Sequence, residues 1–311
     1  MLLDLLEIML TVIAPIFLII GGAWTISRQF KPDPRSISSF LIYLFTPALV
    51  FRGIYNTEIT GSELGGVAFV VLGVMGVMAG IGLAYSRIRG FDARMEGAFV
   101  LSIILVNAAN YGIPLNTFAF GEQGEQVAIL VYVFNTGVGN VLGVFFASRG
   151  KGTIRDALMN VLKGPIGYAA IAGFIANYLR QSDPNFMLPP TLERAINIAA
   201  DGSIPGMLAL LGLQLSRVHL RGRLRPILVA TGIRLMIAPF VGLALASIIG
   251  LTGVTFNVAV VQASMPTAVL ASALATQFGS DAEFTSAVTF TSTLLSVLTL
   301  SVIILLLRGG T

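Results

Sequence analysis

NAANYGIPLN, residues 107–116, interrupts an otherwise apolar stretch that runs from residue 94 to residue 120. A proline inside a helix removes one backbone donor and clashes with the carbonyl four residues earlier, and a glycine weakens the helix further. Three asparagines within ten residues are costly against lipid, so they are expected to face protein, water or ligand. The stretch therefore predicts a helix that is broken near its middle.

A second interruption of the same kind, QASMPT, occupies residues 262–267 of another apolar stretch. Pro114 and Pro266 are each expected near the start of a second half-helix, where a missing N–H costs little. The amides around 113–117 and 265–269 would then point into the two breaks. The alternative is that both prolines only kink continuous helices and that the polar groups satisfy the freed carbonyls.

The composition places these segments in a membrane. Of the 311 residues, 55% are hydrophobic and 11% are charged, and the mean hydropathy is +0.87. A soluble domain carries about 25% charged residues, so this chain could not cover its own surface in water. Soluble enzymes, nucleic-acid-binding proteins and disordered proteins are excluded on this ground.

The residue inventory also narrows the chemistry. Cysteine is absent and His219 is the single histidine, so the sequence predicts no disulfide, no thiolate nucleophile and no metal site built from these residues. No G-x-x-x-x-G-K-[ST] loop occurs, and no connection is long enough for an ATPase domain. We therefore expect neither an enzyme nor a bound cofactor.

Counting apolar segments of about 20 residues, the length that crosses a bilayer as a helix, predicts an all-α integral membrane protein with ten transmembrane helices. The predicted spans are 6–26, 36–55, 64–86, 94–120, 125–148, 158–180, 191–216, 224–250, 255–278 and 283–307. Fourteen lysines and arginines fall in the connections on one side and four on the other. Because basic loops stay in the cytoplasm, this bias predicts a multi-pass protein of the inner (plasma) membrane with both termini outside.

Sequence features recur in the same order in the two halves of the chain. The pairs are Pro15 with Pro165, Pro47 with Pro205, Pro114 with Pro266, and FGEQGE at 120–125 with FGSDAE at 278–283. An odd number of spans per copy inverts the second copy, an arrangement common in secondary transporters. The sequence thus predicts two inverted five-helix repeats, 1–155 and 156–311, with broken helices four and nine at matching positions.

Two broken helices at matching positions predict a binding site for a small anion. The start of each second half-helix carries about half a positive charge, and helix N-termini bind anions readily. Polar side chains around the breaks would add neutral donors and acceptors. The candidate substrate-binding residues are Asn107, Asn110, Tyr111, Gly112, Pro114, Asn116, Gln262, Ser264, Met265, Pro266 and Thr267.

Two charged residues inside predicted spans are candidates for charge recognition or coupling. Asp201 lies early in the seventh span, where it is interpreted as a helix cap, with a coupling or gating acid and a solvated residue as alternatives. Arg234 lies within the eighth span, where it either has a structural partner or attracts the carboxylate of a substrate.

Neutral polar residues and glycines inside other spans have open interpretations. The polar set could line the substrate site or a sodium site, or it could form hydrogen bonds between helices; its members are Asn135, Asn140, Thr289, Thr291 and Thr293. The glycine pairs are interpreted as points of close helix packing; they are Gly76 with Gly80 and Gly139 with Gly143.

Three motifs together resemble the bacterial and archaeal auxin efflux carrier family. They are NAANYGIPLN at 107–116, MPTAVLASALATQFG at 265–279 and LFTPALVF at 44–51. The family is related to the plant PIN-FORMED carriers and, more distantly, to bile-acid sodium symporters. The plant proteins have a long hydrophilic loop between the halves, whereas the link here, 149–157, is short.

The resemblance implies a scaffold of helices 1, 2, 6 and 7, a mobile transport domain of helices 3–5 and 8–10, and a homodimer formed through the scaffold. It implies that substrate binds where helices four and nine cross and that the transport domain moves like an elevator. The substrate contacts that it carries over are Asn110, Tyr111, Gly112, Pro114, Met265 and Pro266.

The expected function is secondary transport of small organic acid anions, either auxin-like acids or dicarboxylates such as malonate, by potential-driven uniport or efflux. The alternative is sodium- or proton-coupled symport, with Asp201 as the acid. The alternative from a different functional class is a channel or a membrane sensor of solutes. The expected partners are the carboxylate, membrane lipid and a second copy of the chain, with no nucleic acid.

Overall fold

The computed structural model describes residues 2–148, 164–183, 185–218 and 224–309. Every regular element in these ranges is a helix, with η denoting a π-helical turn, which confirms the all-α prediction. The first elements are α1 (Leu2–Ile8), η1 (Met9–Ile13), α2 (Ala14–Phe30), α3 (Pro34–Phe40), η2 (Leu41–Phe45), α4 (Thr46–Tyr55), α5 (Gly61–Ile88), α6 (Ala93–Ile104), η3 (Ala108–Gly112) and α7 (Ile113–Ser148). The later elements are α9 (Pro165–Ser182), α10 (Pro190–Asp201), α11 (Ser203–Leu215), α12 (Leu224–Gly232), η4 (Ile233–Ile237), α13 (Ala238–Ile248), α14 (Gly253–Ala263), α15 (Val269–Phe278) and α16 (Ala282–Gly309).

Seven helical runs in the described ranges are long and apolar enough to cross a membrane. They are Leu3–Phe30, Pro34–Tyr55, Gly61–Ile88, Ala108–Gly143, Pro190–Leu215, Leu224–Ile248 and Ala282–Gly309. Large apolar side chains on these runs remain exposed on the outside of the bundle, as lipid-facing residues do. The helices therefore have the length and composition of a multi-pass membrane protein.

The other three predicted spans differ from a long continuous apolar helix. The fourth, 94–120, is divided between α6 and the run that begins at η3, and the ninth, 255–278, is divided between α14 and α15. The sixth corresponds to α9, and its expected first residues, 158–163, lie outside the described residues. The predicted repeat boundary between residues 155 and 156 also lies outside them.

Each of the four π-helical turns in the described part of the chain ends two residues before a proline. These prolines are Pro15, Pro47, Pro114 and Pro239. Because a proline lacks the N–H and crowds the preceding turn, a local widening of the helix accommodates the ring without ending the helix. Pro114 therefore lies in a helix that continues through it, contrary to the expectation that the fourth helix breaks there.

A single glycine separates the predicted fourth and fifth spans. Gly121 adopts φ 68° and ψ −154° inside α7, so that two helices meet there without the longer connection expected at 121–124. Residues with a side chain are strongly disfavoured in this backbone region. Gly279, which follows α15, also has a positive φ of 77°.

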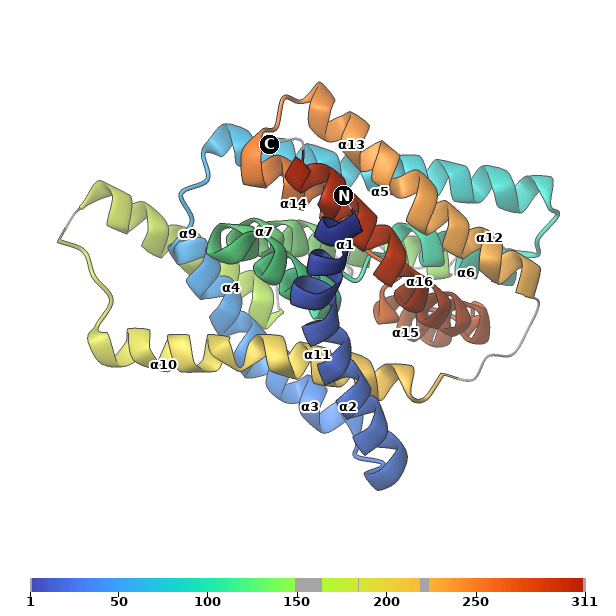
Figure 1. The fold of residues 1–311 in the computed structure, drawn as a ribbon, viewed down its shortest axis with the longest axis horizontal. Helices are drawn as coiled ribbons and strands as arrows, with labels where there is room; N and C mark the ends of the chain where they lie inside the picture. The colour runs from blue at the N-terminus through green and yellow to red at the C-terminus, as the bar shows by residue number, and fades with distance from the viewer. Residues whose placement is uncertain (1, 149–163, 184, 219–223, 310–311) are drawn as a thin grey trace.

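The helices pack in pairs that are distant in the sequence. In Figure 1, α2 lies beside α11, and α4 contacts both α9 and α10. On the other side of the molecule, α5 packs against α6 and α13, and α15 against α16. The two broken helices connect these groups, since one apolar core joins α6 to α14–α16 and another joins η3 to α2 and α11.

Candidate functional site

The two helix breaks lie side by side and are joined through their backbones. Val106 and Thr267 form an antiparallel bridge, the isolated β-pairing of the described residues. Two hydrogen bonds of 2.9 Å flank the bridge, Asn107 N to Pro266 O and Ala268 N to Leu105 O. Each break therefore supplies the hydrogen-bond partners that the other has lost from its helix.

The breaks are displaced from the positions that the prolines predicted. The first turn after the first break is Ala108–Gly112, not 113–117, because the helix passes through Pro114. Pro266 lies within the second break, three residues before α15 begins at Val269. The expectation of two interrupted helices holds, and the residues at the start of each second half-helix shift accordingly.

Gln262 connects the two broken helices through its side chain. Its Nε2 donates to Ala108 O at 3.3 Å, across from α14 to the π-helical turn. A Cβ at Gly112 would lie 2.5 Å from Gln262 Oε1, so only glycine at this position leaves room for the amide in its present place. Gly112 thus permits the close approach of the two helices, in addition to weakening its own helix.

Four predicted site residues carry buried polar atoms without a hydrogen-bond partner in the described structure. These atoms are Asn107 Nδ2, Tyr111 Oη, Asn116 Oδ1 and Gln262 Oε1. The hydroxyl of Ser296 lies near Tyr111 Oη, but the two groups do not have the geometry of a hydrogen bond. Buried polar groups are nearly always paired, so a group of orphaned atoms around the breaks indicates a place for water or a ligand.

Asn116, through its other side-chain atom, and two further predicted residues form hydrogen bonds within the protein. Asn116 Nδ2 donates to Gly112 O at 2.7 Å, and Ser264 Oγ donates to Val260 O at 2.7 Å. Thr267 Oγ1 donates to Ser102 O at 2.6 Å. These bonds satisfy backbone carbonyls near the breaks, which is the role that the alternative interpretation of the sequence gave to the polar groups. The same region also contains the orphaned atoms.

The remaining site candidates differ in their exposure. Asn110 is half-buried on the first turn after the break, whereas Pro114, Met265 and Pro266 are buried. Asn110 is therefore the polar candidate in this turn that a solute could reach directly.

Arg234 is fully buried and donates to three backbone carbonyls. Its Nε donates to Met265 O at 2.8 Å and its Nη1 to Ile103 O at 2.9 Å. Its Nη2 donates to Ala263 O. The structure thus places the guanidinium on the backbone of both broken helices, and a direct contact with a substrate carboxylate stays a prediction.

Asp201 has a partner that the sequence did not reveal. Its Oδ1 accepts from Arg52 Nη1 at 2.6 Å, while Arg52 Nη2 forms an ion pair of 3.1 Å with Glu125. The helix cap expected at Asp201 is not formed, since α11 follows Gly202 without a side-chain cap. In the sequence, Arg52 contributed only to the count of basic residues on the outer side of the membrane. No local sequence pattern links it to Glu125 and Asp201, which lie far along the chain.

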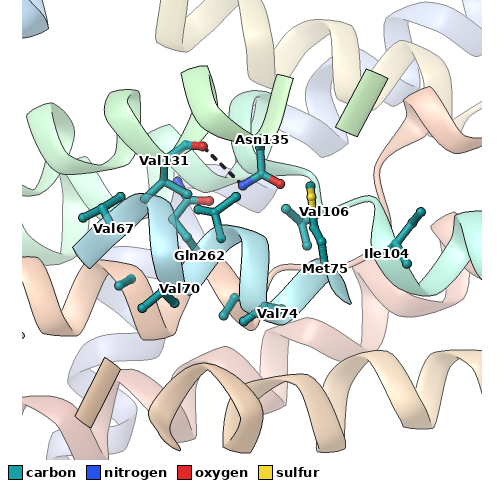
Figure 2. Close-up of a pocket in the computed structure, with 12 residues that line it drawn as sticks. Val67, Val70, Val74, Met75, Ile104, Val106, Val131, Asn135 and Gln262 are labelled. Atoms are coloured by element: carbon teal, nitrogen blue, oxygen red, sulfur yellow. Dashed lines mark hydrogen bonds between the residues drawn. The ribbon is translucent and has the colours of Figure 1, made fainter. Parts of the chain in front are cut away.

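A small cavity beside the breaks cannot hold an organic acid. Figure 2 shows that valine, methionine and isoleucine side chains line it, with Asn135 and Gln262 as its polar residues. Its volume of about 20 Å³ accommodates roughly one water molecule. Asn135 Nδ2 is already bonded to Val131 O at 3.2 Å, and the side chain of Asn140 lies outside the described residues.

A larger cleft opens between α11 and the α15–α16 pair. Its volume is about 360 Å³, within the usual range of sites for small molecules. Val269 and Ser272 bring the first turn of α15 to its wall, and Thr289 contributes from α16. Arg217 is the cation among its lining residues, and Glu283 is the carboxylate. The cleft therefore leads from the molecular surface to the start of the half-helix that follows the second break.

The pairing of the two breaks can be tested by cross-linking in this cysteine-free chain. Val106→Cys combined with Thr267→Cys is expected to form a disulfide on mild oxidation, because facing residues of this non-hydrogen-bonded type have Cα atoms about 4.5 Å apart. Peptide mass spectrometry would detect the link. Val106→Cys with Thr276→Cys, further along α15, should stay reduced, and equal behaviour of the two pairs would contradict the pairing.

Comparison with known proteins assigns the chain to a family. Residues 8–304 match the family described as membrane transport protein. This chain is a member of the membrane transport protein family. The match covers most of the chain and confirms the resemblance drawn from the three motifs. As a membrane transport protein, the chain moves solute across a bilayer.

Named relatives of this membrane transport protein come from archaea and bacteria. An "Uncharacterized transporter" of Methanothermobacter thermautotrophicus is 25% identical over 272 residues, covering 87% of this chain and 88% of the relative. An uncharacterized transporter of Methanocaldococcus jannaschii is 25% identical over 281 residues, 86% of this chain and 87% of the relative. A "Putative malonate transporter" of Rhizobium meliloti is 26% identical over 288 residues, 88% of this chain and 87% of the relative.

Proposed function

We propose that this chain is a secondary transporter of small organic carboxylates and that the substrate binds at the paired helix breaks. The observation that carries the proposal is the set of orphaned polar atoms on Asn107 and Gln262, beside the two interruptions, and on Asn116, in the helix that follows the first of them. Buried polar atoms that stay unpaired in a low-dielectric interior destabilise a protein, and a bundle of continuous helices can form without them.

The charge preference follows from helix polarity. In the first turns after the breaks, Ala108 N donates to Val106 O at 2.8 Å and Ala271 N to Ala268 O at 3.1 Å. The other first amides of these turns have no acceptor within their own helices. Such amides, together with the positive end of the helix dipole, favour a negatively charged ligand. Asn110 would add a neutral donor at the half-buried entrance to this site.

Two inverted repeats of five helices account for the symmetry of the breaks. The antiparallel bridge between Val106 and Thr267 supports this arrangement, because it relates one break to the other by an approximate twofold rotation. Gly121 and Gly279, from the two matching sequence motifs, both adopt positive φ at the ends of corresponding helices. On this basis the fourth and ninth of ten helices cross at the substrate site.

The substrate class is supported by one relative and by the size of the cleft. The relative's name refers to malonate, a small dicarboxylate. The cleft beside α15, at about 360 Å³, is large enough to admit an acid of this size from the surface. An auxin-like aromatic acid is the other member of the proposed class.

An elevator movement would join these features into a transport cycle. Arg52 lies on α4, in the proposed scaffold, and its partner Glu125 lies on α7, in the proposed transport domain. Under the predicted topology this ion pair closes the outer side, while the cleft beside α15 opens to the cytoplasm. The structure would then represent an inward-open state, with the homodimer formed through the exposed flank of α9 and α10.

We propose potential-driven uniport as the energy source. No Asp, Glu, His or Lys occurs in the segments 105–116 and 262–269 that form the breaks. An inside-negative potential expels an anion with about 2.3 kcal/mol per charge per 100 mV, which is close to fortyfold in concentration. Proton-coupled symport is the second candidate, because Glu125 and Asp201 share Arg52 and protonation of either would release it.

Binding of malonate and of indole-3-acetate to purified protein tests the substrate class, with malonamide and indole-3-acetamide as neutral controls. At least one acid is expected to raise the melting temperature, while its amide does not. Asn110→Ala should weaken that binding roughly tenfold or more, since a hydrogen bond to a charged group is worth about 1.5–3 kcal/mol. Asn185→Ala, on an exposed turn, is the matched control.

Flux in proteoliposomes then separates the energy sources when potential, pH and sodium are varied independently. Uniport predicts that accumulation of the acid follows the imposed potential alone. Accumulation driven by a proton or sodium gradient without any effect of potential would rule out uniport, and wild-type affinity in Asn110→Ala would move the site elsewhere.

A further inference from the structure

Arg234 lies where the two first half-helices end. It is 0% exposed and belongs to η4, the π-helical turn of a third helix. Ile103, which accepts from Nη1, is the next-to-last residue of α6. Ala263 and Met265, which accept from the other two nitrogens, end and follow α14. One side chain thus contacts the carbonyl ends of both broken helices.

The carbonyl end of a helix carries partial negative charge. Its last carbonyls have no donor within the helix and together act as about half an elementary charge. Two such ends meet at Arg234. The guanidinium can satisfy several of these carbonyls at once because its donors form a rigid planar fork.

The charge of Arg234 is balanced by these dipoles and not by an acid. The Nε, Nη1 and Nη2 atoms of Arg234 each donate to a backbone carbonyl, whereas the acids Glu125 and Asp201 pair with Arg52. The crossing of two broken helices has two negative and two positive helix ends. A cation at the negative ends offsets them and leaves the positive ends of the two second half-helices, which begin at Ala108 and Val269, without an opposing charge, although Ala108 N itself donates to Val106 O at 2.8 Å.

We propose that Arg234 gives the paired breaks their selectivity for anions by neutralising the carbonyl ends of α6 and α14. It acts as a positioning and charge-compensating residue, without touching the substrate. The inference deepens the proposed function and rests on it for the location of the bound anion. It also predicts a positive electrostatic potential at the start of α15 that is present without any substrate.

A single cysteine can report this potential in the otherwise cysteine-free chain. Ser272 lies one turn into α15 and lines the open cleft, so Ser272→Cys is accessible from water. The measured quantity is the rate of modification by anionic methanethiosulfonate ethylsulfonate divided by the rate for the cationic ethyltrimethylammonium reagent. This ratio is compared with the ratio for a free small thiol. It responds to the local electrostatic potential, so it would not change if Arg234 served only to pack the helices.

With Arg234 present, the ratio should exceed that of the free thiol. Arg234→Gln, which keeps donors but removes the charge, should lower it by about two orders of magnitude. A unit charge about 10 Å away at an effective dielectric constant near 20 changes the rate of each singly charged reagent roughly 15-fold, in opposite directions for the anion and the cation. Arg234→Lys, which keeps the charge, should leave the ratio within about twofold. An unchanged ratio in Arg234→Gln would overturn the proposal.

A second measurement holds even if Arg234→Gln does not fold. Arg217→Gln removes the cation that lines the cleft, and its ratio at Ser272→Cys should still exceed that of the free thiol. A ratio equal to the free thiol in this variant would also overturn the proposal. Absence of acid binding to the unmodified protein, with the ratios as expected, would instead contradict the proposed function and leave the charge role of Arg234 supported.

Discussion

Gly212→Ala is expected to destabilise the protein by about 1–3 kcal/mol, the usual cost of forcing an extra methyl group into a packed contact. A Cβ at this position of α11 would collide with the backbone carbonyl of Ile20 and lie 2.8 Å from Ala23 Cβ. Both contacts belong to α2, and a backbone carbonyl cannot move aside as a side chain can. The two helices would have to separate.

Thermal unfolding followed by the fluorescence of Trp24, the single tryptophan, measures this effect directly at α2. Gly21→Ala is the matched control. Gly21 lies on α2, the helix that Gly212 touches, and a Cβ at Gly21 meets nothing within 4 Å. That change should be neutral or slightly stabilising, since alanine favours a helix over glycine. Equal melting temperatures for the two variants would show that α2 and α11 are not held at this distance.

Cross-linking Arg52→Cys to Glu125→Cys with a short bis-methanethiosulfonate reagent is expected to abolish transport completely. The two residues form an ion pair of 3.1 Å between α4 and α7, which the proposed elevator mechanism assigns to the stationary and the moving domain. A covalent link between the domains would prevent the movement, and a reducing agent should restore flux. Flux of the expected carboxylate into proteoliposomes is the measurement.

The control for this experiment lies inside the proposed scaffold. Ser216 Oγ donates to Ser27 Oγ at 2.6 Å between α11 and α2, and both residues are buried. A disulfide between Ser27→Cys and Ser216→Cys should leave transport intact, because both helices belong to the proposed stationary domain. Full transport in the linked Arg52–Glu125 pair would mean that α4 and α7 move together.

The existence of the helix breaks could be predicted because their causes are local. Asparagines in NAANYGIPLN are unfavourable against lipid wherever the helix lies, so an interruption and a protein-facing orientation follow from these residues alone. The register of the break could not be predicted in this way. Leu105 and Asn107 find their backbone partners outside the helix, because Ala268 N donates to Leu105 O and Pro266 O accepts from Asn107 N, both from the other half of the chain.

The effect of proline depended on whether the surrounding helix could widen. A π-helical turn precedes Pro114, and the helix continues through it, whereas Pro266 lies in extended backbone between two helices. The rule that proline disrupts a helix applies to both residues. The tertiary contacts of each turn decided between a wider helix and a true interruption.

Glycine patterns illustrate the same limit on the packing of helices. Gly76 and Gly80 were interpreted as a close contact, yet a Cβ at either would meet nothing within 4 Å, so this interpretation is wrong. Gly139 and Gly143 do lie against neighbouring side chains, including Leu105 and Leu274. Small-residue spacing identifies a face of a helix on which approach is possible, but not the helix that approaches it.

The sequence by itself determined the membrane environment, the all-helical class, the two interruptions and the family, since hydropathy, proline and buried amides act within one segment. Only the tertiary structure decided which charges and carbonyls meet. Arg234 with the ends of α6 and α14, and Arg52 with Glu125 and Asp201, join residues far apart in the chain. Such pairings are fixed when the helices pack, because a buried charge or carbonyl takes whichever partner the neighbouring helix presents.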